Sequence, residues 1–280
     1  MIKKFVQDTI VFAVVTFLVI NLVCIGLMRF PIFANALFPD QRWLWSYHRV
    51  RQTYQPLETD VLVVGDSVTA QIFLNYENEG YLPTLRDATA GGMYVMIAHA
   101  LENNPQIRDV YYVISPLSIG AITSEFTTMG FLKPFFSVQN LTYFSPPMFD
   151  LVREKPLAIF YILPIAKFIP IDEIQYERSA FGTLPPYAVT ELMRVMGLCN
   201  QTGVTLHLVA PPVSERVFEE YNGWESIRTS AANTPLAPLV TDYLDDLVIL
   251  PDDVFVDDFH FSGAYLSKQR EEMQATILAR

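Results

Sequence analysis

Residues 60–67 read DVLVVGDS, an apolar run rich in β-branched side chains that ends at a glycine, an aspartate and a serine. A short, continuous apolar run of this kind is typical of a strand buried on both faces of a parallel sheet. Residues 85–89, 110–114, 204–210 and 254–256 are further strand candidates along the chain. The stretch at 60–67 therefore predicts the first strand of such a sheet, with polar chemistry directly at its end.

Helical patterns lie between and after these strands, at residues 93–103, 186–201 and 262–279. Strands that alternate with helices predict an α/β fold, in which a parallel sheet is covered on both faces. Ligands bind such sheets outside the carboxyl ends of the strands. The search for a site therefore starts at the ends of the predicted strands.

Ser67 follows the first strand where the chain turns into a helix, so backbone N–H groups and the positive end of the helix dipole lie beside it. A serine hydroxyl becomes a strong nucleophile only when a base removes its proton. The chain has four histidines, and His260 alone lies in a predicted loop between the last strand and the closing helix. Asp257 precedes it by three residues, so one tight turn would direct the carboxylate at the imidazole, as a catalytic triad requires.

Taken together, these blocks resemble the SGNH (GDSL-type) hydrolase superfamily over about residues 59–280. The resemblance implies a flavodoxin-like, three-layer parallel sheet, with Ser67 as nucleophile, His260 as base and Asp257 as its acid partner. It also implies that the backbone N–H groups of Ser67 and Gly91, the latter within Ala90-Gly91-Gly92, hold the oxyanion. Asp66 is expected to be structural and Asp258 to be solvated.

One block departs from the family pattern. The family places an asparagine after its third strand as an oxyanion donor, whereas residues 113–118 read VISPLS. Ser115 or Ser118 could donate a hydroxyl instead, or the hole could have two donors. Because the loss of one donor typically costs 10²–10³ in rate, the departure weakens the case for fast hydrolysis but leaves the triad intact.

The N-terminal segment differs in kind from this domain. Thr9–Met28 is twenty residues without a charge, enough to span about 30 Å as a helix, which is the thickness of a bilayer core. Since the run exceeds the 7–15 apolar residues of a signal peptide, we expect an uncleaved transmembrane anchor over residues 1–28 rather than a cleaved signal. Residues 29–58 are rich in aromatic and basic side chains and form either a collar at the lipid headgroups or a linker packed on the domain.

Charge separates the same two parts. Of 280 residues 51% are apolar and 18% charged, with a net charge of −11, a balance that argues against disorder and against nucleic-acid binding. Residues 1–58 carry six basic and three acidic groups, whereas residues 59–280 carry 13 and 27. Two cysteines exclude a disulfide scaffold and a cysteine-based zinc ribbon.

An insertion rich in aromatic residues and interrupted by prolines occupies about residues 120–185 of the domain. Its most apolar part, Lys155–Ile171, is interrupted by Pro164, Lys167 and Pro170, which argues against a second bilayer span. Two interpretations remain open: a buried piece of the core, or an element that lies at the membrane interface or binds a partner.

An anchor followed by a triad that lacks the asparagine resembles a narrower branch: membrane-tethered SGNH-like proteins, such as the D-alanyl transfer protein of teichoic-acid modification and the SGNH components of alginate and cellulose acetylation. This resemblance implies an acyltransferase that passes acyl groups, with acetyl expected, to hydroxyls of an envelope polysaccharide. It implies a multi-spanning O-acyltransferase as partner, a glycan acceptor, and an external (periplasmic or extracellular) domain on a single-pass protein of the inner or plasma membrane. No cofactor or metal is expected.

Two alternatives to this function stay open at the level of the sequence. A membrane-tethered carbohydrate or lipid esterase would use the same triad, with water in place of the glycan. A non-catalytic SGNH-like scaffold that binds a membrane partner would account for the missing asparagine and the aromatic insertion.

Overall fold

A computed structural model describes residues 2–30, 43–73, 80–84, 90–120, 133–153, 158–168 and 182–280. The α-helices are α1 (Ile2–Arg29), α3 (Trp43–Gln52), α4 (Ser67–Phe73), α5 (Ala90–Asn103), α7 (Pro146–Arg153), α8 (Pro186–Thr202), α9 (Glu215–Glu220), α10 (Glu225–Ala231), α11 (Ala237–Asp245) and α12 (Gly263–Leu278). Short 3₁₀ helices are η2 (Val138–Tyr143), η3 (Ala158–Ile162), η4 (Ile165–Phe168), η6 (Asn222–Trp224) and η7 (Asp252–Val254). The strands are β1 (Val61–Gly65), β2 (Asp109–Val113), β3 (Thr205–Val209), β4 (Val213–Ser214) and β5 (Ile249–Leu250).

The principal sheet contains three parallel strands in the order β1-β2-β3, with Val61 opposite Asp109 and Asp109 opposite Thr205. Residues 80–84 continue it on the far side of β1, because Leu82 donates its N–H to the carbonyl of Val63 at 2.8 Å. All of these segments end at the same edge, which is where Ser67 begins α4.

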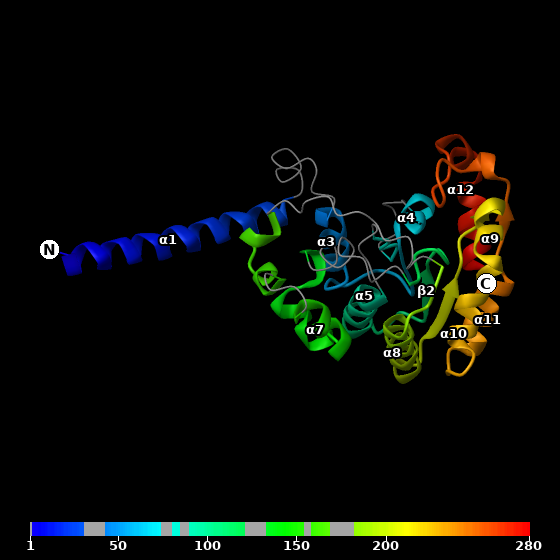
Figure 1. Cartoon of the computed structure of the whole chain (residues 1–280), viewed down its shortest axis with the longest axis horizontal. Coiled ribbons are helices and arrows are strands. Elements are labelled where there is room, and N and C mark those ends of the chain that lie inside the picture. Colours follow the sequence, from blue (N-terminus) through cyan, green and yellow to red (C-terminus); the bar gives the residue numbers. More distant parts are fainter. Residues whose placement is uncertain are drawn as a thin grey trace.

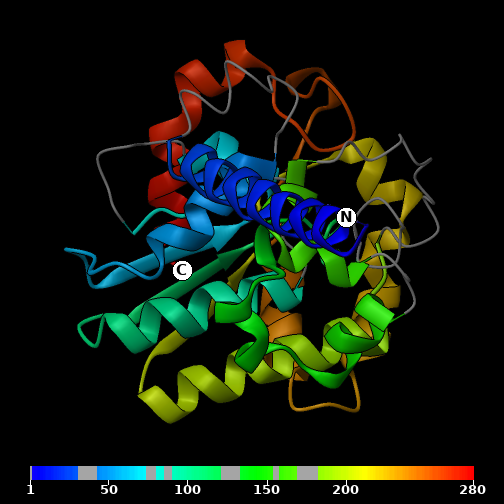
Figure 2. The same ribbon diagram turned by 90° about the vertical axis from the view of Figure 1, so that its left-hand side faces the viewer.

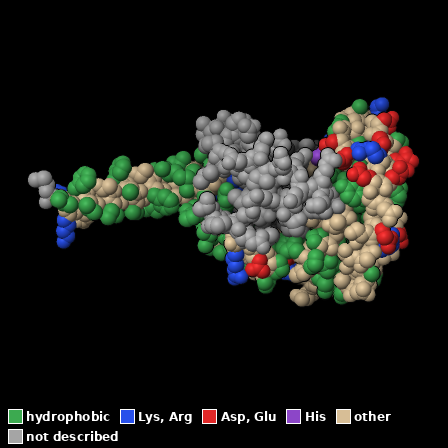
Figure 3. All heavy atoms as spheres, in the orientation of Figure 1, with side chains coloured by type: hydrophobic (Ala, Val, Ile, Leu, Met, Phe, Trp, Pro, Cys, Tyr) green, Lys and Arg blue, Asp and Glu red, His purple; other side chains and the backbone are tan. Residues whose placement is uncertain are grey.

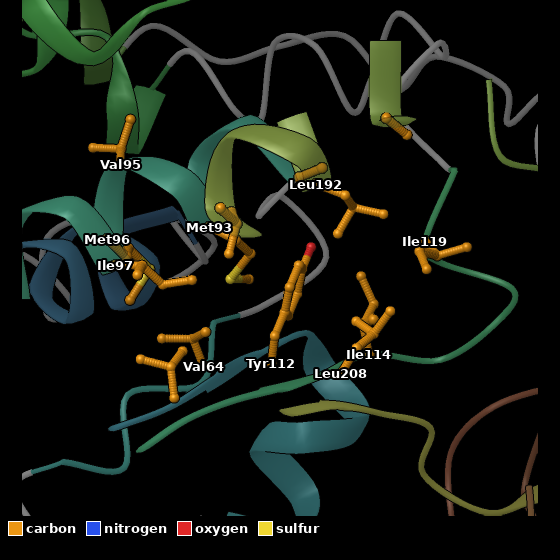
Figure 4. Close-up of a cluster of buried hydrophobic side chains, with 14 of the residues drawn as sticks. Val64, Met93, Val95, Met96, Ile97, Tyr112, Ile114, Ile119, Leu192 and Leu208 are labelled. Atoms are coloured by element: carbon orange, nitrogen blue, oxygen red, sulfur yellow. The ribbon is translucent and has the colours of Figure 1, made fainter. Parts of the chain in front are cut away.

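Helices cover both faces of this sheet (Figure 1). Side chains that alternate along the strands point to opposite sides: Leu62, Val64 and Tyr112 pack on the face covered by α5 and α8, and Val63, Val113 and Val209 on the face covered by α4 and α12. Figure 4 shows the first of these faces, with Tyr112 and Leu208 of the strands directed toward Met93 and Leu192 of the helices. The chain is therefore a mixed α/β protein, as its alternating pattern predicts.

Most of the predicted elements are present. The predicted helices at 93–103, 186–201 and 262–279 correspond to α5, α8 and α12, and the predicted strands at 110–114 and 204–210 to β2 and β3. The strand predicted at 85–89 lies outside the described residues.

The strand predicted at residues 254–256 is wrong. Asp252–Val254 form the 3₁₀ helix η7, and Phe255 makes one antiparallel bridge, to Phe261. Three apolar residues are too few to pair along a sheet, and the chain turns back on itself to present His260. The last strand is instead β5, which pairs with β4 in a separate two-stranded parallel sheet that the sequence pattern did not reveal.

At the N-terminus, α1 is long and apolar enough to cross a membrane; it projects from the domain in Figure 1 and points toward the viewer in Figure 2. The last turns of α1 pack against the domain. They form one buried apolar cluster with α3 and η4, whose members are Cys24, Met28, Trp43, Leu44 and Phe168. Further along, Leu57 belongs to the same core as the sheet. From α3 onward, the predicted linker is thus packed on the domain, the second of its two interpretations.

Candidate active site

Ser67 is the first residue of α4, directly after β1, and Asp66 is the residue that caps this helix. The Asp66 carboxylate accepts hydrogen bonds from the backbone N–H groups of Val68 at 3.0 Å and Thr69 at 3.2 Å. Such a cap satisfies first-turn N–H groups that have no acceptor within the helix. The GDS motif therefore places the Ser67 side chain at the sheet edge and leaves its own N–H unengaged among the described residues.

Asp66 also joins two strands, since its second carboxylate oxygen accepts from the N–H of Ser115 at 3.2 Å. The side chain is buried, with 4% exposed. Asp66 thus binds backbone N–H groups of α4 and of the residue that follows β2 by two positions, which agrees with the structural role expected from the sequence.

His260 reaches Ser67 from the other end of the chain, on a tight turn between η7 and α12. The N–H of Val256 donates to the carbonyl of His260, and the N–H of Ser262 donates to the carbonyl of Val254, both at 2.8 Å. Ser262 then caps α12, accepting from the N–H of Tyr265. The turn is held on both sides of His260, which fixes the direction of the imidazole.

Three side chains form one hydrogen-bonded chain at this point. The Oγ of Ser67 lies 3.0 Å from Nε2 of His260, and Nδ1 of His260 lies 2.8 Å from Oδ2 of Asp257. With Nδ1 carrying the proton that the carboxylate accepts, Nε2 is left to accept the proton of the Ser67 hydroxyl. The structure thus brings together the serine, histidine and aspartate that the sequence pattern selects.

The Asp257 carboxylate is anchored by the backbone as well as by the imidazole. Its Oδ1 accepts from the N–H groups of Phe259 at 2.8 Å and His260 at 2.7 Å. Burial on its own raises the pKa of Asp257, but these two N–H groups and the His260 ring together hold the pKa below its usual range. Asp257 therefore stays charged wherever the histidine acts as a base.

The triad is open to solvent on one side. The side chain of Asp257 is 45% exposed and that of His260 is 16% exposed. Figure 3 shows acidic side chains gathered on the part of the domain that carries α9 and α12, with a histidine at the surface beside them. Ser67 itself is partly exposed among the described residues.

Gly91 lies in the first turn of α5, where backbone N–H groups have no intrahelical acceptor. A Cβ atom at this position would lie 2.4 Å from Oη of Tyr187 and 3.0 Å from Sδ of Met148. Close packing is thus a reason for glycine here that is independent of any oxyanion role.

Ser115 is placed at the end of β2 and is buried. Its N–H donates to Asp66, and its hydroxyl oxygen accepts from the N–H of Leu117 at 3.3 Å. The hydroxyl hydrogen alone remains for a substrate oxygen, so a contribution of Ser115 to an oxyanion hole would come from that single donor.

Gln71 is a residue of the site that the sequence analysis missed. It lies one turn after Ser67 on α4, and its side-chain oxygen accepts from the N–H of Phe261 at 3.0 Å, while its amide nitrogen faces the carbonyl of the same residue at 3.5 Å. Gln71 thereby connects α4 to the turn formed by residues 257–261, called the histidine turn below. The i, i+4 spacing from Ser67 is the only local signal, because the partner lies 190 residues away.

Asp258, which was expected to be solvated, has 36% of its side chain exposed and also forms an ion pair. Its carboxylate lies 2.6 Å from a guanidinium nitrogen of Arg216, at the surface. The pair links the start of α9 to the histidine turn and leaves Asp257 as the carboxylate that faces the imidazole.

The other histidines lie away from Ser67. His99 contacts Asn140 at 3.0 Å, His207 contacts Asp109 at 3.0 Å, and His48 lies on α3. Among the described residues, no group of three His, Cys, Asp or Glu side chains has the arrangement of a metal site.

No protein-family model, curated protein or solved structure matches this chain. The function is therefore argued from the site itself.

Proposed function

We propose that this protein is a membrane-anchored serine acyltransferase, which carries an acyl group on Ser67 and passes it to a hydroxyl of a cell-envelope or exported polysaccharide. The observation that carries the proposal is the hydrogen-bonded chain from Ser67 through His260 to Asp257. This constellation activates a hydroxyl for acyl transfer on several unrelated folds.

In the proposed reaction, Nε2 of His260 takes the proton of Ser67 as Oγ attacks the acyl carbonyl of a donor. The N–H groups of Ser67 and Gly91 hold the oxyanion, with the Ser115 hydroxyl as a third donor. When the tetrahedral intermediate collapses, the leaving group takes the proton from the imidazolium and the acyl–serine ester remains. A glycan hydroxyl then attacks this ester, with His260 as base, which releases the acylated glycan and restores Ser67.

The arrangement of the sheet is compatible with the flavodoxin-like SGNH fold that the motifs resemble. Residues 80–84, β1, β2 and β3 lie side by side and parallel, between helices on both faces. The nucleophile follows β1 and the base precedes the last helix, α12. We therefore propose that the domain belongs to this fold.

Two further features support transfer at a membrane. The apolar helix α1 provides an anchor, and we propose that the domain lies on the external side, with a multi-spanning O-acyltransferase supplying the acyl group. The domain's excess of 14 acidic groups over residues 59–280 favours neutral or cationic glycans over strongly anionic ones.

A serine-directed fluorophosphonate probe tests the nucleophile. We expect the full chain in detergent to be labelled, Ser67→Ala to remain unlabelled, and Ser267→Ala, which removes an exposed hydroxyl on α12, to label like the parent. Absence of labelling in the folded parent protein would contradict the enzyme and favour a scaffold.

Acyl content of the polysaccharide separates transfer from hydrolysis. In cells that carry Ser67→Ala, O-acyl groups on the glycan should disappear, and the parent protein should co-purify with a multi-spanning acyltransferase. Increased glycan acylation in the variant would instead indicate an esterase. Protease treatment of spheroplasts tests the topology, because an external domain is digested and an internal one is protected.

A further inference from the structure

The segment Ala158–Phe168, which contains η3 and η4, has an unusual distribution of side chains. On its outer side Ile159 and Phe160 are 60% and 53% exposed, while on its inner side Tyr161, Ala166 and Phe168 are buried. A surface loop in water ordinarily turns polar side chains outward. This segment presents aliphatic and aromatic ones.

The segment is attached to the N-terminal helix. The N–H of Ile165 donates to Oδ1 of Asn21 at 3.3 Å, while the amide nitrogen of Asn21 donates to the carbonyl of Phe17 at 2.9 Å. Phe168 packs with Cys24 and Met28 of the same helix. Asn21, the only asparagine of the apolar stretch, thus accepts a hydrogen bond from the backbone N–H of Ile165 in η4. This N–H group would need an acceptor wherever water is scarce.

A second attachment fixes the segment from inside. Lys167 is 2% exposed, and its Nζ donates to the carbonyls of Lys133 at 2.8 Å and Phe136 at 3.0 Å. The same ammonium group lies 5.7 Å from the centre of the Tyr47 ring. The two attachments, at Ile165 and Lys167, hold η4 against α1 and the rest of the domain.

The position of these contacts along α1 sets the depth of the segment. None of the described residues from Ile2 to Ile20 is buried, and the uncharged stretch Thr9–Met28 covers about 30 Å at 1.5 Å per residue, close to the thickness of a hydrocarbon core. The contacts with η4 lie between Asn21 and Met28, the part of this stretch nearest the domain. In Figures 1 and 2 this part of the chain lies at the end of the domain from which α1 projects.

We propose that Ala158–Phe168 is a second membrane-contacting element, which inserts Ile159 and Phe160 into the headgroup region of the bilayer that α1 spans. The occupant of this face is the phospholipid surface, because the exposed side chains are apolar and the segment that carries them is attached to the domain end of the membrane helix, at Asn21 and Met28. Arg29, exposed at the end of α1, lies at the level of lipid phosphates. The inference rests on the proposed anchor, not on the proposed chemistry.

The consequence concerns the reach of the active site. A domain on a flexible tether samples many distances from the membrane, whereas a domain held at α1 and at residues 158–168 keeps one orientation. The sheet edge with Ser67 would then meet acyl donors at a constant height above the bilayer.

Nitroxide accessibility in nanodiscs of phosphatidylcholine with one fifth phosphatidylglycerol tests the proposal on the full chain. The buried cysteines Cys24 and Cys199 are first replaced by alanine, and single cysteines are then introduced at Ile159, Phe160, Val14 or Val256. Val14 reports the span itself. Val256, 68% exposed and just before the histidine turn, is the matched apolar control.

We expect labels at 159 and 160 to have several-fold lower accessibility to an aqueous nickel complex than the label at 256, and higher accessibility to oxygen. Nickel accessibility at 159 and 160 equal to that at 256 would overturn the proposal, because both positions would then lie in water. An aqueous label at 14 would contradict the anchor instead. The two failures are thus distinguishable in one series.

Discussion

At the sheet edge that carries Ser67, positions are set by hydrogen bonds between residues far apart in the chain, whereas at the membrane end they are set by apolar packing around two polar contacts. Asp66, Gln71 and Asp257 each make hydrogen bonds that direct a neighbour in the site. Around α1, Met28 and Phe168 pack together, and the two polar contacts are those of Asn21 with Ile165 and of Lys167 with the carbonyls of Lys133 and Phe136. The comparison indicates that hydrogen bonds fix the positions of side chains at the sheet edge that carries Ser67, whereas apolar packing predominates where α1 meets η4.

The largest expected contrast between these two regions comes from glycine. A Cβ at Gly65 would lie 1.9 Å from the carbonyl oxygen of Val113, whereas one at Gly26 in α1 meets nothing within 4 Å. We expect Gly65→Ala to abolish the folded domain, because the clash is with backbone, and Gly26→Ala to be tolerated or to stabilise α1 by up to about 1 kcal/mol. Thermal unfolding in detergent measures both, and a folded Gly65→Ala protein would contradict the tight packing of β1 on β2.

Asp257→Asn tests the catalytic edge without altering its size. The amide cannot hold the imidazole with its proton on Nδ1 as the carboxylate does, so the rate of probe labelling at Ser67 should fall by roughly 10²–10⁴. Asp258→Asn, which removes the partner of Arg216, is the control and should label within a few-fold of the parent. Equal losses in both variants would argue against Asp257 as the specific partner of His260.

Lys167→Met probes the buried contact behind η4. Burial lowers the pKa of Lys167 to about 7 from 10.5, so between these pH values the unfolded chain binds a proton that the folded chain does not. Stability should therefore rise from pH 7 toward 10.5, by roughly 5 kcal/mol at 1.36 kcal/mol per pKa unit.

The variant should lack this component, and the difference in unfolding free energy between parent and variant should change with pH. Lys268→Met, on the exposed face of α12, is the control that leaves the pH dependence in place. A parent and a Lys167→Met protein with parallel pH profiles would contradict the burial of the amine.

Gln71→Met distinguishes positioning from stability. Loss of the amide leaves the N–H of Phe261 without its acceptor, which costs about 1–2 kcal/mol, and frees the histidine turn, so we expect labelling of Ser67 to slow by roughly tenfold. Gln274→Met removes a similar contact, from α12 to the carbonyl of Ile72, without touching the turn. It should lower the unfolding temperature but leave the labelling rate unchanged, and equal slowing in both would reduce Gln71 to a structural role.

The smallest effect is expected at the membrane end. Asn21→Leu retains size but removes the acceptor for Ile165, at a cost of roughly 0.5–2 kcal/mol in a membrane setting. Labelling at Ser67 in detergent should be unaffected, while a nitroxide at position 159 should become more mobile in nanodiscs. Leu22→Ala, an exposed position on the same turn, should change neither measurement.

Local patterns predicted a large part of this fold. The apolar run before Gly65 and the amphipathic stretch of α8 carry their signal within a few residues, so their type and approximate bounds are legible. The strand expected at residues 254–256 failed because three apolar residues are equally compatible with a tight turn, and β5 escaped notice because a two-residue strand has no periodicity.

The sequence by itself determined which side chains could form a triad, since Ser67 follows a strand and Asp257 precedes His260 by one turn. Only the tertiary structure decided that these groups meet, that Gln71 binds the histidine turn, and that Asn21 accepts a hydrogen bond from η4. The physical reason is that spacing along the chain encodes contacts within about one turn, whereas contacts across 144 or 193 residues depend on how the packed elements close on one another.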